Sequence, residues 1–230
     1  MIDITMTAVI RPSILKRTLD SFCANMFTPE IIKKYNCRLI INIDPIGENF
    51  SQDYVYNIAK IYFKNTTILK PSVPSFAGAV IRCWENVDQK FCFHLEDDWI
   101  LLTKIDVEKM IISLEENDIV SMRLNKEPSL IKHQQNINFI YHEKLSLNPT
   151  LFKSDFLKDI VGHMDSTLNP EKQLRVNAPG KRGEILRNVK HAIYTGSGNN
   201  KIVQDIGREW MKKTKFYKEI GFTDWRRNEY

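Results

Sequence analysis

The sequence lacks the features that mark several large classes of protein. Its four cysteines form no C-x-x-C pair, which argues against a four-cysteine zinc site, and a chain of 230 residues is not a small disulfide scaffold. Nine glycines and nine prolines exclude collagen-like and linker-dominated architectures. No apolar run approaches the roughly 18–20 residues of a membrane-spanning helix. The opening residues MIDIT do not resemble a signal peptide. These absences predict a cytoplasmic protein.

What is present predicts one large domain with an uneven charge. Hydrophobic residues make up 43% of the chain and charged residues 27%, which supports a buried core and excludes wholesale disorder. The net charge of +5 is not evenly spread, because residues 171–230 hold 14 Lys and Arg against 7 Asp and Glu. The remaining residues hold 19 against 21. The basic C-terminal quarter suggests an anionic ligand, either phosphates or a nucleic acid, and the plain alternative is a solvated basic tail.

Apolar runs and helical patterns alternate along the first half of the chain. Helical spacing of apolar residues recurs between the runs, which predicts βαβα order and an α/β fold with a mostly parallel sheet flanked by helices. The second half is less regular, with Ser154 as the expected cap of one helix and Asn169-Pro170 as the start of another. Strands are expected at residues 4–10, 38–43, 66–69, 90–95, 118–123 and 189–194.

Three adjacent carboxylates, Glu96, Asp97 and Asp98, follow the strand expected at residues 90–95. Ligands of open α/β sheets bind beyond the carboxyl ends of the strands. Three neighbouring carboxylates repel one another, and their oxygens suit Mg²⁺ or Mn²⁺, with the phosphates of a nucleotide completing the shell. The pattern therefore predicts a metal site, and the alternative is an acidic surface turn.

Three segments of the chain stand out: TAVIRPSILKRTLDSF, FAGAVIRCWENVDQKFCFHLEDDWIL and LSLNPTLFKSDFL. Together they resemble the nucleotide-diphospho-sugar transferases, the glycosyltransferases of the GT-A fold. The resemblance implies a single GT-A-like domain over residues 1–230, with a nucleotide-sugar-binding half (1–125) and an irregular acceptor half (126–230) that has a basic end. It is also compatible with a phage-type enzyme.

The resemblance implies a donor site at the sheet edge. Thr7 and Arg11 would line the nucleotide pocket, and Asp44 would contact the base. Arg82 would lie near the diphosphate or the acidic segment. Ordinary strand and helix-entry chemistry is the alternative for Thr7 and Arg11.

The same resemblance assigns the metal ligands. Glu96 and Asp98 match the outer positions of the D-x-D pattern, with Asp98 the direct metal ligand and Asp97 a further donor-site residue. Glu stands where the family has Asp, which leaves open whether Glu96 contacts metal, ribose or neither. His191 would be a further ligand of the metal or the diphosphate, unless it is a core histidine.

The catalytic base and a diphosphate-binding arginine are expected in the second half. An inverting transferase needs a carboxylate that takes the proton of the acceptor hydroxyl, and the resemblance points to Glu171, with Asp165 as the fallback. Glu171 could equally complement a helix dipole. The segment from Gly207 to Trp210 resembles a family ending, and its Arg208 could bind a diphosphate leaving group with two parallel hydrogen bonds.

The leading hypothesis is therefore a metal-dependent, inverting glycosyltransferase that uses a nucleotide-sugar, expected to be a UDP-sugar, with Mn²⁺ or Mg²⁺. Its acceptor hydroxyl would belong to a glycan or to a hydroxymethylated base in phage DNA. A sugar nucleotidyltransferase is the second hypothesis, although its Gly-rich, lysine-containing loop is missing after the first strand, where Arg11-Pro12-Ser13 stands. A non-enzymatic nucleic-acid binder is the third, supported by the basic C-terminal quarter and its aromatic residues Trp210, Phe216, Tyr217 and Trp225.

Overall fold

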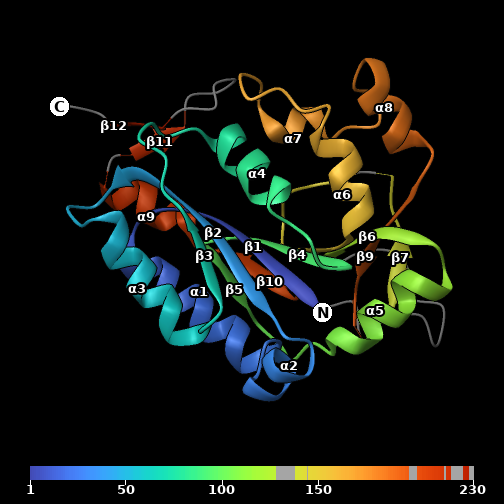
Figure 1. Cartoon of the computed structure of the whole chain (residues 1–230), viewed down its shortest axis with the longest axis horizontal. Helices are drawn as coiled ribbons and strands as arrows, with labels where there is room; N and C mark the ends of the chain where they lie inside the picture. The colour runs from blue at the N-terminus through green and yellow to red at the C-terminus, as the bar shows by residue number, and fades with distance from the viewer. Residues whose placement is uncertain (128–137, 144, 197–200, 215, 219–224, 228–230) are drawn as a thin grey trace.

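The computed structural model describes residues 1–127, 138–143, 145–196, 201–214, 216–218 and 225–227, and Figure 1 shows their arrangement. The strands are β1 (Ile2–Ile10), β2 (Arg38–Gly47), β3 (Thr66–Leu69), β4 (Phe91–Glu96), β5 (Trp99–Leu101), β6 (Ile119–Leu124), β7 (Phe139–Tyr141), β8 (Thr150–Lys153), β9 (Lys190–Tyr194), β10 (Val203–Asp205), β11 (Phe216–Lys218) and β12 (Trp225–Arg227). The helices are α1 (Pro12–Asn25), α2 (Pro29–Lys34), α3 (Gln52–Tyr62), α4 (Phe76–Glu85), α5 (Val107–Glu116), α6 (Ser154–Val161), α7 (Pro170–Gln173), α8 (Gly180–Arg187) and α9 (Gly207–Thr214).

Eight strands form one sheet in the order β3-β2-β1-β4-β8-β6-β9-β7. The neighbours β3, β2, β1 and β4 are all parallel, and β6 is parallel to β9. Strand β8 runs antiparallel to both β4 and β6, and β7 runs antiparallel to β9 at the edge. The predicted fold class, α/β with a mostly parallel sheet flanked by helices, is confirmed.

The strand β8 was not expected as a strand. Its residues lie in an apolar stretch, 145–152, that has no regular alternation in the sequence. In the structure Thr150, Leu151 and Phe152 are fully buried between β4 and β6. A strand that is covered on both faces needs no polar residue at every second position, so its pattern is hard to distinguish from other buried segments.

Helices cover both faces of the sheet (Figure 1). On one face, α1, α3 and α5 pack against alternate residues of the central strands, such as Ile4 and Met6 of β1, in the larger hydrophobic core. On the other face, α4 and α6 pack around Trp84 and Phe152 in a second core. The apolar residues that recur at helical spacing in these segments are therefore the ones that face the sheet.

The two helix starts expected in the second half have different outcomes. Helix α7 begins as predicted, because the side chain of Asn169 accepts a hydrogen bond from the backbone N–H of Lys172 and Pro170 occupies the first turn. Ser154 does not cap α6. It is the first helical residue, Lys153 precedes it as the cap residue, and no partner for the buried Ser154 hydroxyl lies within the described ranges.

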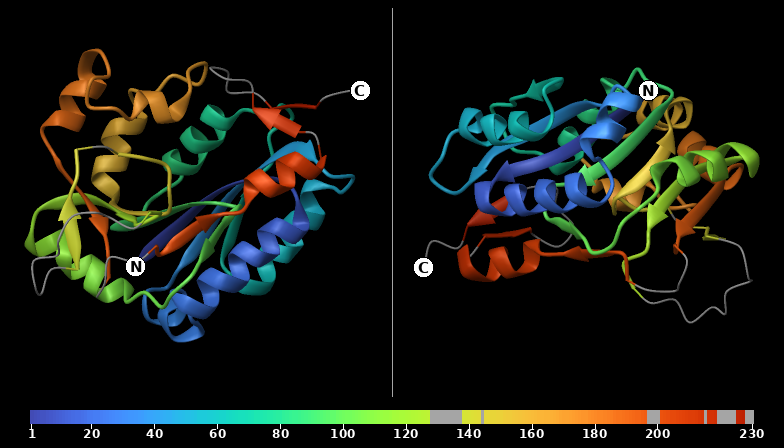
Figure 2. Two further views of the ribbon diagram at one scale, coloured as in Figure 1. Left: turned by 180° about the vertical axis from the view of Figure 1, so that it is seen from behind. Right: turned by 90° about the horizontal axis from the view of Figure 1, so that it is seen from below.

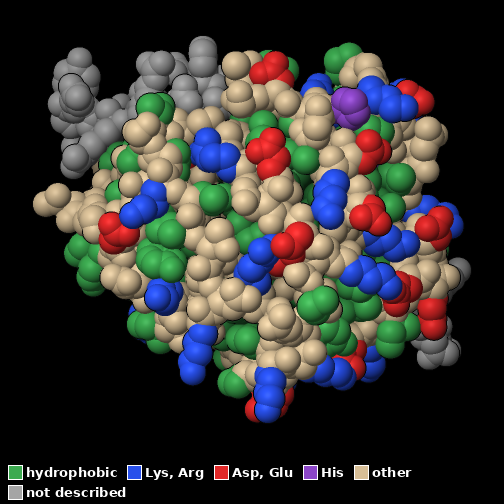
Figure 3. All heavy atoms as spheres, in the orientation of Figure 1, with side chains coloured by type: hydrophobic (Ala, Val, Ile, Leu, Met, Phe, Trp, Pro, Cys, Tyr) green, Lys and Arg blue, Asp and Glu red, His purple; other side chains and the backbone are tan. Residues whose placement is uncertain are grey.

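The surface drawn in Figure 3 mixes acidic and basic side chains, with no continuous area of one sign on this face. Among the described residues, no helix has both the length and the apolar character needed to cross a membrane. The proposed division of the chain into halves at residue 125 stays a prediction, although the eight-stranded sheet takes strands from both halves.

Candidate active site

The candidate site lies where β1, β2 and β4 end side by side. Parallel pairing sets Thr7 of β1 opposite Glu96 of β4, and Val9 of β1 opposite Asp44 of β2. Because parallel strands end at the same edge of a sheet, this register gathers residues that are far apart in the sequence. One small pocket at this edge, about 20 Å³ in volume, is lined by Thr7, Ala8, Val9, Arg11, Asp44, Phe76, Ala79, Glu96 and Asp97. Five residues that the sequence proposed for the donor site therefore line one pocket, while their roles stay predictions.

Arg11 holds the acidic segment together. Its Nε donates to Asp97 Oδ2 at 2.9 Å, and its Nη2 donates to Asp97 Oδ1. The same Nη2 lies 2.9 Å from Asp98 Oδ2. Burial works against a charged guanidinium, but the carboxylates of Asp97 and Asp98 outweigh it and raise the pKa of Arg11 above its ordinary value. Arg11 is therefore a permanent cation between two acidic side chains.

Asp97 makes structural contacts at this edge, and its expected role in holding the donor stays a prediction. Its side chain is almost fully buried, and Oδ2 also accepts from the backbone N–H of Val9 at 3.2 Å. Its backbone carbonyl accepts from Thr18 Oγ1 at 2.6 Å, which ties α1 to the acidic segment. These contacts occupy the Asp97 carboxylate within the protein, so its effect on a donor would pass through Arg11.

Asp98 and Glu96 are the more accessible carboxylates. The Asp98 side chain is 19% exposed, whereas that of Asp97 is 2% exposed. Glu96 is half-buried, and its Oε2 accepts from Trp99 Nε1 at 3.2 Å. Of the three adjacent carboxylates, these two outer positions are the ones that a ligand could reach.

A second polar group surrounds Asp44 at the end of β2. Asp44 Oδ1 accepts from Asn42 Nδ2 at 2.8 Å, and Oδ2 accepts from the backbone N–H of Ser75 at 3.0 Å. Arg82 donates to Asn42 Oδ1 at 2.8 Å and lies 3.5 Å from Asp44. Burial nevertheless dominates and raises the pKa of Asp44 to about 6. Arg82 therefore lies beside Asn42 and Asp44 at the end of β2, and not beside the acidic segment. Its expected place near the diphosphate stays a prediction.

The C-terminal segment covers the acidic edge, as Figure 2 shows for β10 and α9 beside β1. Strand β10 pairs with β5, and the backbone N–H of Ile206 donates to the carbonyl of Asp98 at 2.8 Å. Gly207 lies so close that a Cβ there would overlap Asp98 Oδ2 and would lie 3.0 Å from Arg11 Nη1. Trp210 packs under the Arg11 guanidinium, whose central carbon is 5.3 Å from the ring centroid.

This segment also carries Arg208, whose expected role at the site stays a prediction. Arg208 follows Gly207 directly, its side chain is 76% exposed, and its Nε lies 3.4 Å from Asp205 Oδ2. The sequence did not indicate that Gly207 lies against Asp98 or that its backbone N–H donates to Asp205, although Gly207 belongs to a segment that carried the resemblance. Residues 197–200 and Lys215, which belong to the basic C-terminal quarter, lie outside the described residues.

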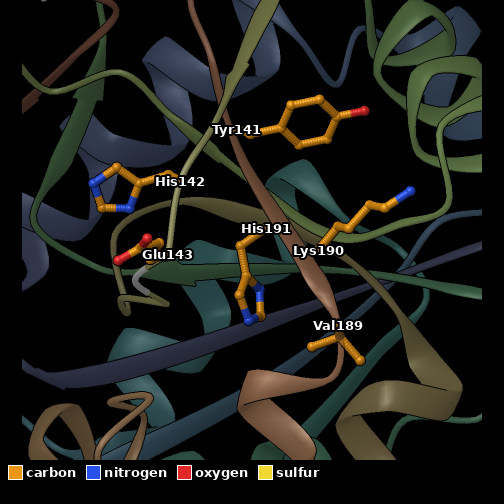
Figure 4. A pocket seen from close by; sticks show the side chains of 6 residues that line it. All are labelled: Tyr141, His142, Glu143, Val189, Lys190 and His191. Carbon is orange, nitrogen blue, oxygen red and sulfur yellow. The ribbon is translucent and has the colours of Figure 1, made fainter.

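The structure does not bring His191 to the acidic edge, which corrects its expected role as a ligand of the same metal. His191 is level with Cys92 of β4 across the sheet, four positions before Glu96. Its strand β9 is third from β4, a lateral separation of about 14 Å. His191 Nδ1 lies 2.7 Å from Ser121 Oγ, and burial lowers the pKa of this histidine to about 4. Figure 4 shows it with His142 and Glu143 in a pocket that shares no lining residue with the candidate site.

The two candidate bases lie on one stretch of the acceptor half. Glu171 is exposed in the first turn of α7, which packs against α4. Asp165 is also exposed, but its Oδ1 accepts from the backbone N–H and the hydroxyl of Thr167, at 2.8 and 2.6 Å. These hydrogen bonds lower the pKa of Asp165, which weakens it as a base. The geometry therefore favours Glu171 over Asp165, and the role itself stays a prediction.

The donor atoms at the acidic edge fit a divalent cation only if a bound nucleotide completes its shell. In the described part of the chain, no three His, Cys, Asp or Glu side chains are grouped so that they could hold a metal ion. Glu96 and Asp98 offer carboxylate oxygens, and Mg²⁺ commonly binds through one or two carboxylates together with substrate phosphates and water. Asp98 would then be shared between the cation and Arg11.

The sequence matches no family model and no curated protein. Solved structures do match its fold. TarS of S. aureus has 9% identity over 92% of this chain and 38% of its own, with a TM-score of 0.57. The mannosyltransferase PcManGT from Pyrobaculum calidifontis, solved with GDP-Man and Mn²⁺, has 8% identity over 68% of this chain and 45% of its own, with a TM-score of 0.53. GalNAc-T7, solved with UDP, GalNAc and Mn²⁺, has 9% identity over 83% of this chain and 42% of its own, with a TM-score of 0.57.

These similarities define the class of fold. The chain has the GT-A fold of nucleotide-sugar glycosyltransferases, as the resemblance of its sequence segments implied. It spans less than two thirds of the length of each of these proteins.

Proposed function

We propose that this protein is a glycosyltransferase that moves a sugar from a nucleotide diphosphate donor to an acceptor hydroxyl. The observation that carries the proposal is the gathering of Thr7, Arg11, Asp44 and Glu96 in one pocket at the carboxyl edge of β1, β2 and β4. Proteins of the same fold were solved with UDP-GlcNAc, in the case of TarS, and with GDP-Man, in the case of PcManGT. A UDP-sugar is our proposed donor.

The reaction breaks the bond between the anomeric carbon and the diphosphate oxygen, and its electron pair leaves with the diphosphate. The acceptor oxygen forms the new bond, and its proton passes to Glu171 if that residue is the base. Backside attack would make the enzyme inverting. A divalent cation held by Asp98, with or without Glu96, would neutralise charge on the diphosphate when it is bound.

The residues of the chain itself supply further positive charge to the leaving group. Arg11 is fixed beside Asp98, and the exposed Arg208 follows Gly207 at the same edge. An arginine fork matches two phosphate oxygens, so Arg208 is the proposed direct contact to the diphosphate. Preorganised cations of this kind stabilise the charge that develops as the glycosidic bond breaks.

The acceptor is a separate question, for which the sequence suggested a glycan or a hydroxymethylated base in phage DNA. The mixed charge of the face in Figure 3 gives no specific support to nucleic-acid binding. The aromatic residues that suggested it have partners within the fold where they are described: Trp210 stacks on Phe216, with ring centroids 5.2 Å apart. The side chains of Tyr217 and Trp225 lie outside the described set. We therefore propose a saccharide acceptor.

The test is a thermal-shift panel of UDP- and GDP-sugars, with Mn²⁺, with Mg²⁺ and with EDTA. Selective stabilisation by one donor, lost in Asp98→Ala and kept in the exposed variant Asp53→Ala, is the expected result. Indifference to every nucleotide under all three conditions would contradict the proposal. Binding to DNA with a steep salt dependence and no donor effect would favour a nucleic-acid binder instead.

A further inference from the structure

We propose that a second cavity, separate from the donor pocket, binds a small phosphate-bearing molecule. The cavity lies at the opposite end of the β5–β10 ribbon from Asp98 and Asp205. Its wall contains Leu102, Thr103, Lys104, Ile105, Asp106, Lys109, Asn138, Tyr194, Thr195, Gly196, Lys201 and Ile202. The donor pocket shares none of these residues.

Backbone hydrogen bonds between distant segments hold the wall of the cavity in place. Leu102 N–H donates to the carbonyl of Ile202 at 2.8 Å, and Thr195 N–H donates to the carbonyl of Asn138 at 2.8 Å. Ile105 N–H donates to the carbonyl of Asn25 on α1, also at 2.8 Å. The cavity has a volume of about 450 Å³, within the usual size of small-molecule sites. It is a built feature of the fold.

The charge of the wall points to an anion. Three lysines, Lys104, Lys109 and Lys201, stand against one carboxylate, Asp106. Asp106 is already engaged as the cap of α5: its Oδ1 accepts from the backbone N–H groups of Glu108 and Lys109, and its Oδ2 lies 3.7 Å from Lys109 Nζ. Within the described ranges, Lys104 and Lys201 form no ion pair. Two ammonium groups at one cavity therefore have no anionic partner among the residues that the structure describes.

The rest of the wall can bind hydroxyl groups. Thr103 and Asn138 supply a hydroxyl and an amide, and the buried hydroxyl of Thr195 has no hydrogen-bond partner among the residues that the structure describes. Buried polar groups are normally satisfied, by ligand or water where the protein offers no partner. A sugar phosphate has both the anionic group and the hydroxyls that this wall would accept, and its phosphate charge balances the excess of two lysines.

The cavity is separate from the proposed reaction site. The three residues of β5 separate it from the acidic edge by about 10 Å along the strand. It lies on the side of the sheet that α1 and α5 cover, whereas Glu171 lies on α7, which packs against α4. Phosphate binding at this cavity therefore does not depend on the proposed function.

The experiment is an NMR titration of the full chain with inorganic phosphate, glucose 6-phosphate and glucose. The test variant is Lys104→Met/Lys201→Met, and the matched control is Lys60→Met/Lys64→Met, which removes the same charge near the end of α3. We expect glucose 6-phosphate to bind more tightly than glucose, and the test variant to lose about tenfold or more in affinity. The control variant should bind as the parent chain does, and UDP binding should be unchanged in both.

The outcomes separate this inference from the proposed function. If phosphate and glucose 6-phosphate fail to bind, or bind equally to the test variant, the cavity site is wrong even when UDP binds. If UDP fails to bind while glucose 6-phosphate binds through Lys104 and Lys201, the cavity site stands and the glycosyltransferase proposal falls. If the two lysines affect only the binding of a single-stranded oligonucleotide, the ligand is a nucleic acid and the sugar-phosphate assignment is overturned.

Discussion

Arg11 Nη2 and Asp98 Oδ2 lie 2.9 Å apart at the carboxyl edge of the sheet, although the two residues belong to different strand ends. The same guanidinium also pairs with the buried Asp97, so one cation lies between two carboxylates and the three groups keep a net charge of −1. A metal ion that arrives at this edge would be attracted by this negative charge, but it would share Asp98 with Arg11. Variants of Arg11 and of its acidic partners therefore test contacts that the sequence alone does not indicate.

The first prediction concerns the stability of the Arg11 network. Arg11→Met leaves Asp97 buried without its cation, and we expect the free energy of unfolding to fall by about 3–5 kcal/mol. Arg11→Met/Asp97→Asn removes both charges and should recover a large part of that loss. Urea denaturation measures the difference. Equal losses in the single and double variants would show that the ion pair is not the source of the effect.

The second prediction concerns the contact between Gly207 and Asp98. Gly207→Ala places a Cβ against Asp98 Oδ2 and 2.9 Å from its Cγ, so α9 or the carboxylate has to move. We expect a loss of about 1–3 kcal/mol in stability and weaker nucleotide binding. Gly162→Ala is the control, since its nearest neighbour would lie at 3.8 Å, an ordinary contact. Calorimetry with UDP tests both, and identical behaviour of the two variants would remove Gly207 from the site.

The third prediction is a pH dependence that originates at Asp44. The folded state raises the pKa of this carboxyl to about 6, so it holds the proton more tightly than the unfolded chain does. The resulting stabilisation is fully present below about pH 4 and is lost as the pH rises through about 6, a change of roughly 3 kcal/mol.

Asp44→Asn should remove that component from the pH profile of unfolding, since asparagine does not titrate. The exposed variant Asp53→Asn should leave the profile unchanged. Urea unfolding measured from pH 4 to pH 7 provides the comparison. A profile that keeps its slope in Asp44→Asn would place the titrating group elsewhere.

The fourth prediction separates the two candidate bases. Glu171→Gln should abolish sugar transfer while UDP-sugar binding stays intact, because the amide cannot accept the acceptor proton. Asp165→Asn should retain transfer, since that carboxylate serves the turn at Thr167. Glu184→Gln, on the neighbouring helix α8, is the control for a general loss of surface charge. Product formation by mass spectrometry is the measurement, and transfer by Glu171→Gln would exclude this residue as the base.

Much of the fold could be predicted because its signals are local. The strand that ends at Glu96 and the helix that begins at Pro12 follow from short-range patterns of apolar residues. The pairing of Arg11 with Asp97 could not be predicted in this way, because the two residues are 86 positions apart and meet only through the register of β1 with β4. The position of His191 away from the acidic edge could not be predicted for the same reason: it depends on strand order, which periodicity does not encode.

The placement of β8 has a consequence for the order in which the chain can fold. Strand β4 is complete at Glu96, and β6 is complete at Leu124, yet the two are joined in the sheet only through β8 at residues 150–153. Until a ribosome has released that segment, β4 has a vacant edge and β6 has no link to the first four strands. A nascent chain therefore carries an unpaired sheet edge for more than fifty residues of synthesis, and such edges invite association with other chains.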